Sequence, residues 1–162
     1  MHNTYTINRT LILWLYLCVF LVVFLVFWGG ITRLSGSGLS ITEWKPITGT
    51  IPPITHISWM EEFNKYQSSP EYKKINYDIN LSEFKKIYLI EYFHRIIARL
   101  LGIIFIIPMA YFFCKNHIKF KTKINLLIIL ILGGLQGLFG WLMVKSGLID
   151  IPHVSHYRLA IH

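Results

Sequence analysis

Three long apolar runs separate stretches of ordinary polarity, and no other feature constrains this chain as strongly. They cover residues 11–28, 96–113 and 124–144, and a single charge, Arg99, interrupts the second. At 1.5 Å per residue the first run is roughly 27 Å long, which is about the thickness of the hydrocarbon core of a bilayer. We therefore expect an all-α integral membrane protein rather than a soluble domain with a large core.

The second span is predicted to begin well before its apolar run. Asn80, followed three residues later by Glu83, is typical of a capped helix start, and no helix-breaking residue follows until Pro108. We expect one helix over residues 84–113 whose first turns lie outside the membrane. For the first run, a cleaved signal peptide is disfavoured because no small-residue cleavage site follows it.

Positive charge gathers between the second and third spans. The net charge is +8, and the densest cluster is Lys115, Lys119, Lys121 and Lys123. A nucleic-acid partner is not expected, because such binders need their basic residues on a solvated face. A short lysine-rich loop between spans marks the cytoplasmic side. The N-terminus is then cytoplasmic, and the long segment of residues 33–86 lies on the outer side.

The outer segment carries a helical pattern of its own. Ser58 and Glu61 have the spacing of a capping box, and Trp59, Phe63 and Tyr66 then fall on one helical face. Two arrangements are open. The helix lies on the membrane surface, or it packs on the rest of the outer segment.

The third span contains small residues at helical spacing, and a fourth helix follows it. Gly133 and Gly137 are four residues apart, which lets helix backbones approach, and we expect Gln136 to bond to a neighbouring helix. The fourth helix is predicted to start near Ser155. Since the sequence stops at His162, we expect an incomplete chain with a four-helix-bundle half.

Two histidines are the candidate metal ligands. His94 lies where the second helix enters its apolar run, and His162 lies at a similar depth in the fourth helix. Two imidazoles facing each other across a bundle can supply both axial ligands of a heme. Arg95, Arg99 and Arg158 are suited to the heme propionates. The alternative is that these side chains are interfacial and that the arginines extend to the lipid headgroups.

Glu91 lies one helical turn before His94, on the same face. The Glu-x-x-His spacing also occurs in di-iron carboxylate bundles, which need a second copy and further glutamates on other helices. This chain has one copy and no other acidic residue in a span. A di-iron centre is therefore disfavoured.

Short motifs around these positions follow one another in a fixed order. They occupy residues 29–40, 43–46, 52–53, 70–72, 83–85, 91–95, 133–137, 140–144 and 157–162. Together they resemble the heme A synthase family, in its mitochondrial and alphaproteobacterial branch. The resemblance covers nearly everything from Trp28 to the end of the chain.

This resemblance implies a fold and a reaction. The family is an eight-helix protein of two four-helix halves, each with a histidine pair, so residues 1–162 would be the N-terminal half. It oxidises a methyl group of heme O to the formyl group of heme A, the prosthetic group of terminal oxidases. His94 and His162 match the first histidine pair as iron ligands, and Glu91 matches a glutamate expected to be catalytic. We expect Glu91 to assist proton transfer or to stabilise a developing positive charge at the porphyrin edge.

The expected cofactor is heme, as heme b or as the heme O substrate, with its iron. Expected partners are membrane lipid, heme O synthase, terminal oxidase assembly factors and the C-terminal half. The expected location is the inner membrane of a cell, with several spans. Alternatives are an inactive fragment, a non-catalytic membrane interaction protein, or a bis-histidine electron-transfer protein resembling a b-type cytochrome. The last of these leaves Glu91 without a task.

Overall fold

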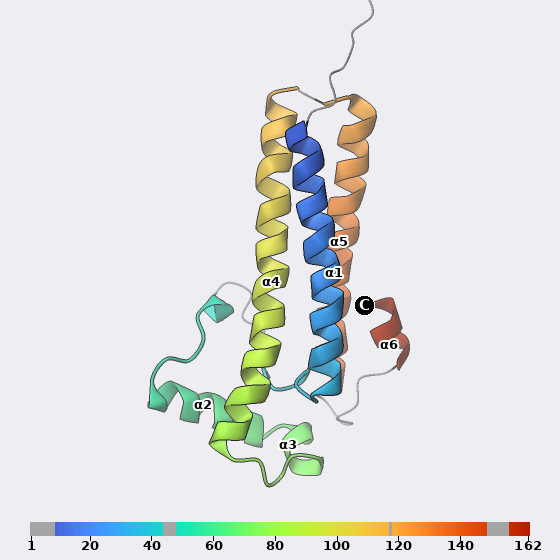
Figure 1. Ribbon diagram of the computed structural model, residues 1–162. Helices are drawn as coiled ribbons and strands as arrows, with labels where there is room; N and C mark the ends of the chain where they lie inside the picture. Colours follow the sequence, from blue (N-terminus) through green and yellow to red (C-terminus); the bar gives the residue numbers. More distant parts are fainter. Residues whose placement is uncertain (1–8, 44–47, 117, 149–155) are drawn as a thin grey trace, which may run out of the picture.

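Three long helices lie side by side in the computed structural model, which describes residues 9–43, 48–116, 118–148 and 156–162 (Figure 1). They are α1 (Arg9–Leu34), α4 (Leu81–Cys114) and α5 (Phe120–Gly147). Each is long and apolar enough to cross a membrane. Every regular element within the described ranges is a helix, so the predicted all-α membrane fold is confirmed.

The short elements gather toward one end of the long helices, which we call the loop end. They are the 3-10 turn η1 (Thr48–Thr50), α2 (His56–Gln67), α3 (Pro70–Lys74) and α6 (His156–Ile161). Figure 1 shows α2 and α3 beneath α4, and α6 beside the lower half of α5. The opposite end, where α4 connects to α5, is the lysine end. The motif residues 44–46 and the predicted helix start at 155 lie outside the described residues.

The predicted capped start of α4 is confirmed. The Glu83 N–H donates to Asn80 Oδ1 over 3.0 Å, and the Asn80 N–H donates to Glu83 Oε2 over 3.0 Å. The helix begins at Leu81 and continues through Pro108 to Cys114, so it extends the expected residues 84–113 at both ends. Its first turns pack against α2 at the loop end.

The capping box predicted at Ser58 and Glu61 is wrong. Helix α2 begins three residues earlier than that box implies, at His56, and its cap is Thr55. The Ser58 N–H donates to Thr55 Oγ1 over 3.2 Å, and the Thr55 N–H donates to Ser58 Oγ over 3.1 Å. A serine hydroxyl therefore makes the return bond that a glutamate usually makes, and Glu61 is left exposed in the next turn.

Helix α2 packs against α4, which decides between the two arrangements left open. Trp59, Phe63 and Tyr66 share one buried face, as predicted, and they contact Phe84 and Tyr88 of α4. Phe84 is fully buried at the centre of this aromatic cluster. The apolar face of α2 is thus buried inside the protein at the loop end.

A glycine ends α1 and turns the chain back toward α4. Gly36 has a φ of +64°, a backbone conformation that is unfavourable for residues with a Cβ atom. Its N–H donates to the Arg33 carbonyl over 3.3 Å, and the Ser37 N–H donates to the Thr32 carbonyl over 3.0 Å. This pair of bonds is a Schellman motif, which satisfies carbonyls at a helix C-terminus. The segment that follows is brought against the start of α4.

The three spans share one apolar core near the lysine end. Its buried members come from all three helices and the turn between α4 and α5, namely Trp14, Cys18, Phe105, Met109, Phe112, Ile118 and Leu126. Toward the loop end, residues 131–139 of α5 are all exposed. The contact between α1 and α4 continues to the loop end, whereas α5 offers an open face there.

Two tryptophans of α1 donate to backbone carbonyls of α4. Trp14 Nε1 donates to Ile104 O over 2.8 Å, and Trp28 Nε1 donates to Ile90 O over 3.0 Å. Ile104 lies four residues before Pro108, which has no N–H to complete the helical bond. An unsatisfied carbonyl in hydrocarbon costs several kcal/mol. Trp14 therefore satisfies the acceptor that Pro108 leaves unbonded.

We expect Trp14→Phe to lower the free energy of unfolding by about 1–3 kcal/mol, because the Ile104 carbonyl loses its donor. Adding Pro108→Ala should restore most of this loss, since an alanine N–H can make the helical bond to Ile104. Unfolding of the purified chain in detergent, followed by circular dichroism, measures both effects.

The matched control is Trp28→Phe with and without Pro108→Ala. The Ile90 carbonyl has the helical N–H of His94 as a second donor, so Pro108→Ala should give no rescue there. Equal rescue of both tryptophan variants would contradict the proposed pairing of Trp14 with Pro108.

Candidate functional site

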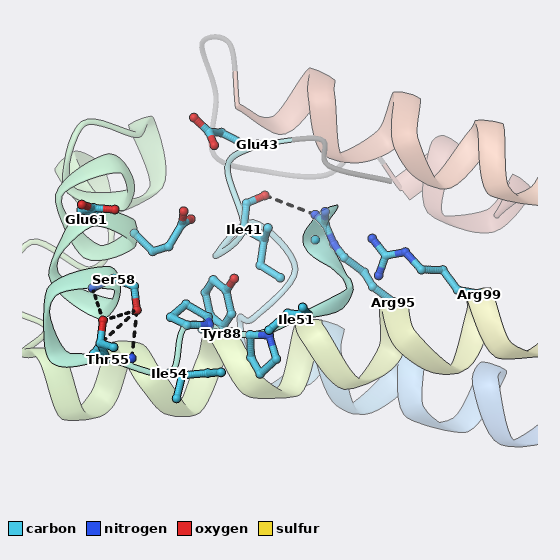
Figure 2. Close-up of a pocket in the computed structure, with 14 residues that line it drawn as sticks. Ile41, Glu43, Ile51, Ile54, Thr55, Ser58, Glu61, Tyr88, Arg95 and Arg99 are labelled. Atoms are coloured by element: carbon cyan, nitrogen blue, oxygen red, sulfur yellow. Dashed lines mark hydrogen bonds between the residues drawn. The ribbon is translucent and has the colours of Figure 1, made fainter. Parts of the chain in front are cut away.

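Glu91 is buried at the loop end of α4 and accepts hydrogen bonds on both oxygens. Only 3% of the residue is exposed. Its Oε2 accepts from the Ser40 hydroxyl over 2.7 Å and from the Ile41 N–H over 2.9 Å, and its Oε1 accepts from Arg95 Nε over 3.1 Å. Arg95 also donates to the Ile41 carbonyl over 3.2 Å (Figure 2). Glu91 and Arg95 thus tie the segment after α1 to α4.

Arg95 and Arg99 form the basic stripe that their spacing predicted. Figure 2 shows them together at one end of a pocket of about 390 Å³ between α4, α2 and the outer segment. Carboxylates lie elsewhere in its lining, from Glu43, Glu61 and Glu62. The lining of the pocket therefore contains two guanidinium groups and, at other positions, three carboxylates.

His94 faces α1 instead of this pocket. Its ring forms a hydrogen bond with the backbone of Leu25. A Cβ placed on Gly29 would lie 3.4 Å from His94 Nε2, so the ring rests directly on the α1 backbone. Consecutive helical residues point about 100° apart, which is why His94 and Arg95 contact different neighbours.

His162 directly follows α6, and its ring rests on α5. Its N–H donates to the Arg158 carbonyl over 3.1 Å, which continues the helical turn. Its Nδ1 lies 3.1 Å from the Gln136 carbonyl oxygen, and Gln136 Nε2 donates to the Ile161 carbonyl over 3.3 Å. The predicted bond from Gln136 to a neighbouring helix is confirmed. The Arg158 side chain is exposed on α6.

The two predicted histidines come from α4 and from the residue that directly follows α6. His162 and Glu91 both lie close enough to His94 to act electrostatically on its ring. Within the described residues, no group of three or more His, Cys, Asp and Glu side chains gathers to hold a metal ion. A heme needs only two axial ligands from the protein, so a site of that kind does not require a larger group of ligands.

A second buried carboxylate, Glu71 of α3, was not singled out by sequence reasoning. It is 6% exposed, and within the described residues its Oε2 has no hydrogen-bond partner. Burial is the largest cause that raises the pKa of Glu71 to about 7, the Tyr66 hydroxyl opposes this rise, and the charge of Glu91 adds to it. An acidic residue in a first helical turn is usually a solvated helix-start signal, so the local pattern concealed its burial.

Comparison with known proteins identifies the family. Residues 12–162 match the COX15-CtaA family, described as cytochrome oxidase assembly protein. The chain belongs to the heme A synthase family. It is 55% identical over 150 residues to the heme A synthase of Wolbachia pipientis wMel, covering 93% of this chain and 43% of that protein.

Other members of the heme A synthase family show the same relation. The chain is 52% identical to the heme A synthase of Neorickettsia sennetsu, over 92% of this chain and 46% of that protein. It is 50% identical to that of Ehrlichia canis, over 99% of this chain and 46% of that protein. The chain therefore spans about half the length of the curated relatives it matches. No solved structure matches it.

Glu91→Leu should lower the free energy of unfolding by about 3–5 kcal/mol, because it leaves the Arg95 charge and two donors without their buried acceptor. Denaturant unfolding in detergent measures this change. Glu61→Gln, which removes an exposed carboxylate from α2, should change stability by less than about 0.5 kcal/mol. Equal effects of the two variants would show that Glu91 does not anchor the outer segment.

Glu71 should make stability fall as pH rises from about 4.5 to about 7. Its pKa is 4.5 ordinarily and about 7 in the folded chain, so between these values only the folded chain keeps the proton. Above pH 7 this contribution should be constant. Melting temperatures at pH 5, 6, 7 and 8 measure the slope, which Glu71→Gln should reduce and Glu61→Gln should retain. An unchanged slope in Glu71→Gln would rule out this assignment.

Proposed function

We propose that this chain is the part of a heme A synthase that binds heme through His94 and His162. The complete protein would oxidise a methyl group of heme O to the formyl group of heme A for terminal oxidases. The observation that carries this proposal is the match over residues 12–162 to a family whose relatives are heme A synthases. The electrostatic influence of His162 on His94 supports it.

The residues present fit a heme. Imidazole nitrogens are the usual protein ligands of heme iron, and these two come from α4 and from the end of α6. Each ring lies against a glycine, at Gly29 and Gly140, and at Gly140 the missing Cβ leaves room for it. When bound, a heme would supply either the porphyrin methyl that is oxidised or, as heme b, a site for electron transfer.

The arginines divide into two groups as partners for heme propionates. Arg95 already donates to Glu91 and to the Ile41 carbonyl. Arg99 lies beside it in the pocket, and Arg158 is exposed on α6, so these two guanidinium groups are candidates as well. A planar guanidinium can bind a carboxylate with two parallel hydrogen bonds.

Glu91 is better suited to a fixed negative charge than to carrying a proton. Both of its oxygens already accept hydrogen bonds, from Ser40, Ile41 and Arg95. A proton arriving at either oxygen would compete with those donors. We therefore assign Glu91 to the electrostatic stabilisation of positive charge that develops near His94 during oxidation.

An electron-transfer protein with a bis-histidine heme is the second candidate. The observation that favours it is the structural task of Glu91, whose bonds to the outer segment account for its burial without any chemistry. Such a protein would bind heme through the same histidines. Analysis of the extracted heme separates the two functions, because only a synthase changes the porphyrin.

The orientation and partners follow from the same proposal. The lysine end would face the cytoplasm, and the outer helices α2 and α3 would lie on the other side of an inner membrane. Heme O synthase would deliver the substrate, and terminal oxidase assembly factors would receive the product. The C-terminal half of the protein would complete the fold.

The chain purified in detergent with added heme should show a low-spin absorption spectrum, which His94→Ala should abolish because one axial ligand is lost. His56→Ala, at an exposed position of α2, should leave the spectrum unchanged. A low-spin spectrum that persists in His94→Ala would exclude His94 as a ligand.

Conversion is then tested in membranes that contain heme O. A parallel sample adds the C-terminal half of the Wolbachia relative, because the chain spans about half of that protein. Extracted heme A would establish the synthase. Unchanged heme O with reversible reduction in both samples would favour the electron-transfer protein.

A further inference from the structure

The ring of His162 lies against a glycine of α5 and is close to a backbone carbonyl of the same helix. A Cβ on Gly140 would lie 2.7 Å from Cε1, 3.1 Å from Nε2 and 3.2 Å from Nδ1 of the ring, so any other side chain there would displace it. The ring nitrogen Nδ1 lies 3.1 Å from the carbonyl oxygen of Gln136, four residues before Gly140. A carbonyl oxygen can only accept, so Nδ1 carries the proton and donates it.

His94 makes the same arrangement against α1. Its ring forms a hydrogen bond with the backbone of Leu25, which lies four residues before Gly29. A Cβ on Gly29 would lie 3.4 Å from Nε2 and 3.9 Å from Cδ2 of the ring. Leu25 thus stands at the same offset from Gly29 as Gln136 does from Gly140, and each ring lies against the glycine of its pair.

Helix geometry explains this shared offset. The carbonyl of one residue accepts the N–H of the residue four positions later, which uses one of its two lone pairs. The side chain of the residue four positions later lies beside the second lone pair of this carbonyl oxygen. A glycine there leaves the oxygen accessible, which is the close approach to a backbone that glycine permits.

We propose that Gly140 is a positioning residue for His162, and that the small size of the residue at position 29 serves His94 in the same way. Each position leaves one stretch of helix backbone accessible, and the resulting hydrogen bond fixes the tautomer and direction of one histidine ring. The second ring nitrogen is thereby left as an acceptor for a metal ion. A hydrogen bond of this kind orients a ligating histidine and increases its basicity. The identification of the metal as a heme iron rests on the proposed function. The positions of the two rings against the glycines do not depend on it.

Glycines elsewhere on the same helices provide matched controls. A Cβ on Gly30 of α1 or on Gly134 of α5 would meet nothing within 4 Å. Substitution at these positions changes helix propensity as it does at Gly29 and Gly140, but it does not touch a histidine ring. Helix content by circular dichroism checks that each variant folds.

The first test needs no heme. The chain is labelled with ¹⁵N-histidine in detergent at pH 8, and proton–nitrogen spectra report the tautomer of each ring, with His94→Gln and His162→Gln identifying the signals. We expect His162 to be protonated at Nδ1 alone. Gly140→Ala should give a mixture of both tautomers, whereas Gly134→Ala should not. A mixture in the unaltered chain, or a single tautomer in Gly140→Ala, would overturn the proposal for His162.

The two glycine positions should differ in the size of side chain that they tolerate. The 3.4 Å contact at Gly29 is an ordinary one, so Gly29→Ala should leave the signal of His94 as a single tautomer. The larger Gly29→Val should shift it to a mixture, while Gly30→Val should not. A single His94 tautomer in Gly29→Val would overturn the proposal for that ring.

A second test uses the chain loaded with heme. Loss of the hydrogen bond makes the imidazole a weaker donor, so Gly140→Ala should raise the reduction potential and change the electron paramagnetic resonance g values relative to Gly134→Ala. Identical spectra and potentials in the two variants would overturn the proposal. If the unaltered chain bound no heme while its histidines kept single tautomers, the proposed function would fail and the positioning role of the glycines would stand.

Discussion

Hydrogen bonds from tryptophan side chains of α1 to backbone carbonyls of α4 hold these two antiparallel helices together. The rest of the molecule is arranged around this helix pair. Trp14 reaches Ile104 and Trp28 reaches Ile90, so the two bonds are fourteen residues apart on each helix. Hydrocarbon offers no competing donors or acceptors, which makes such bonds decisive for helix register. This register sets the level on α1 at which the ring of His94 meets Gly29.

At the loop end a buried ion pair extends the same framework to the outer segment. Glu91 and Arg95 bind Ser40 and Ile41, which the turn at Gly36 has brought back toward α4. An aromatic cluster then packs α2 on the first turns of α4. Glu91 therefore connects the fold to the candidate heme site, since it lies one turn from His94. Its role in stability has to be separated from any role in chemistry.

Much of the architecture followed from local sequence patterns. The three spans, the cap at Asn80, the shared face of Trp59 and Phe63, and the interhelical bond of Gln136 were all predicted and are confirmed. The start of α2 was predicted wrongly, because two overlapping polar patterns compete there and the Thr55 hydroxyl makes the cap. The burial of Glu71 left no local signal.

By itself, the sequence determined the three apolar helices and the capped start of α4, because hydrophobic length and caps depend on residues close together in the chain. Tertiary structure alone decided which acceptors and donors meet. Glu91 bonds to Ser40, 51 residues away, and His162 bonds to Gln136, 26 residues away. Such contacts depend on how the helices pack against one another. The role of a glycine in leaving a backbone carbonyl accessible can be recognised only when a ring from another helix is seen to lie on it.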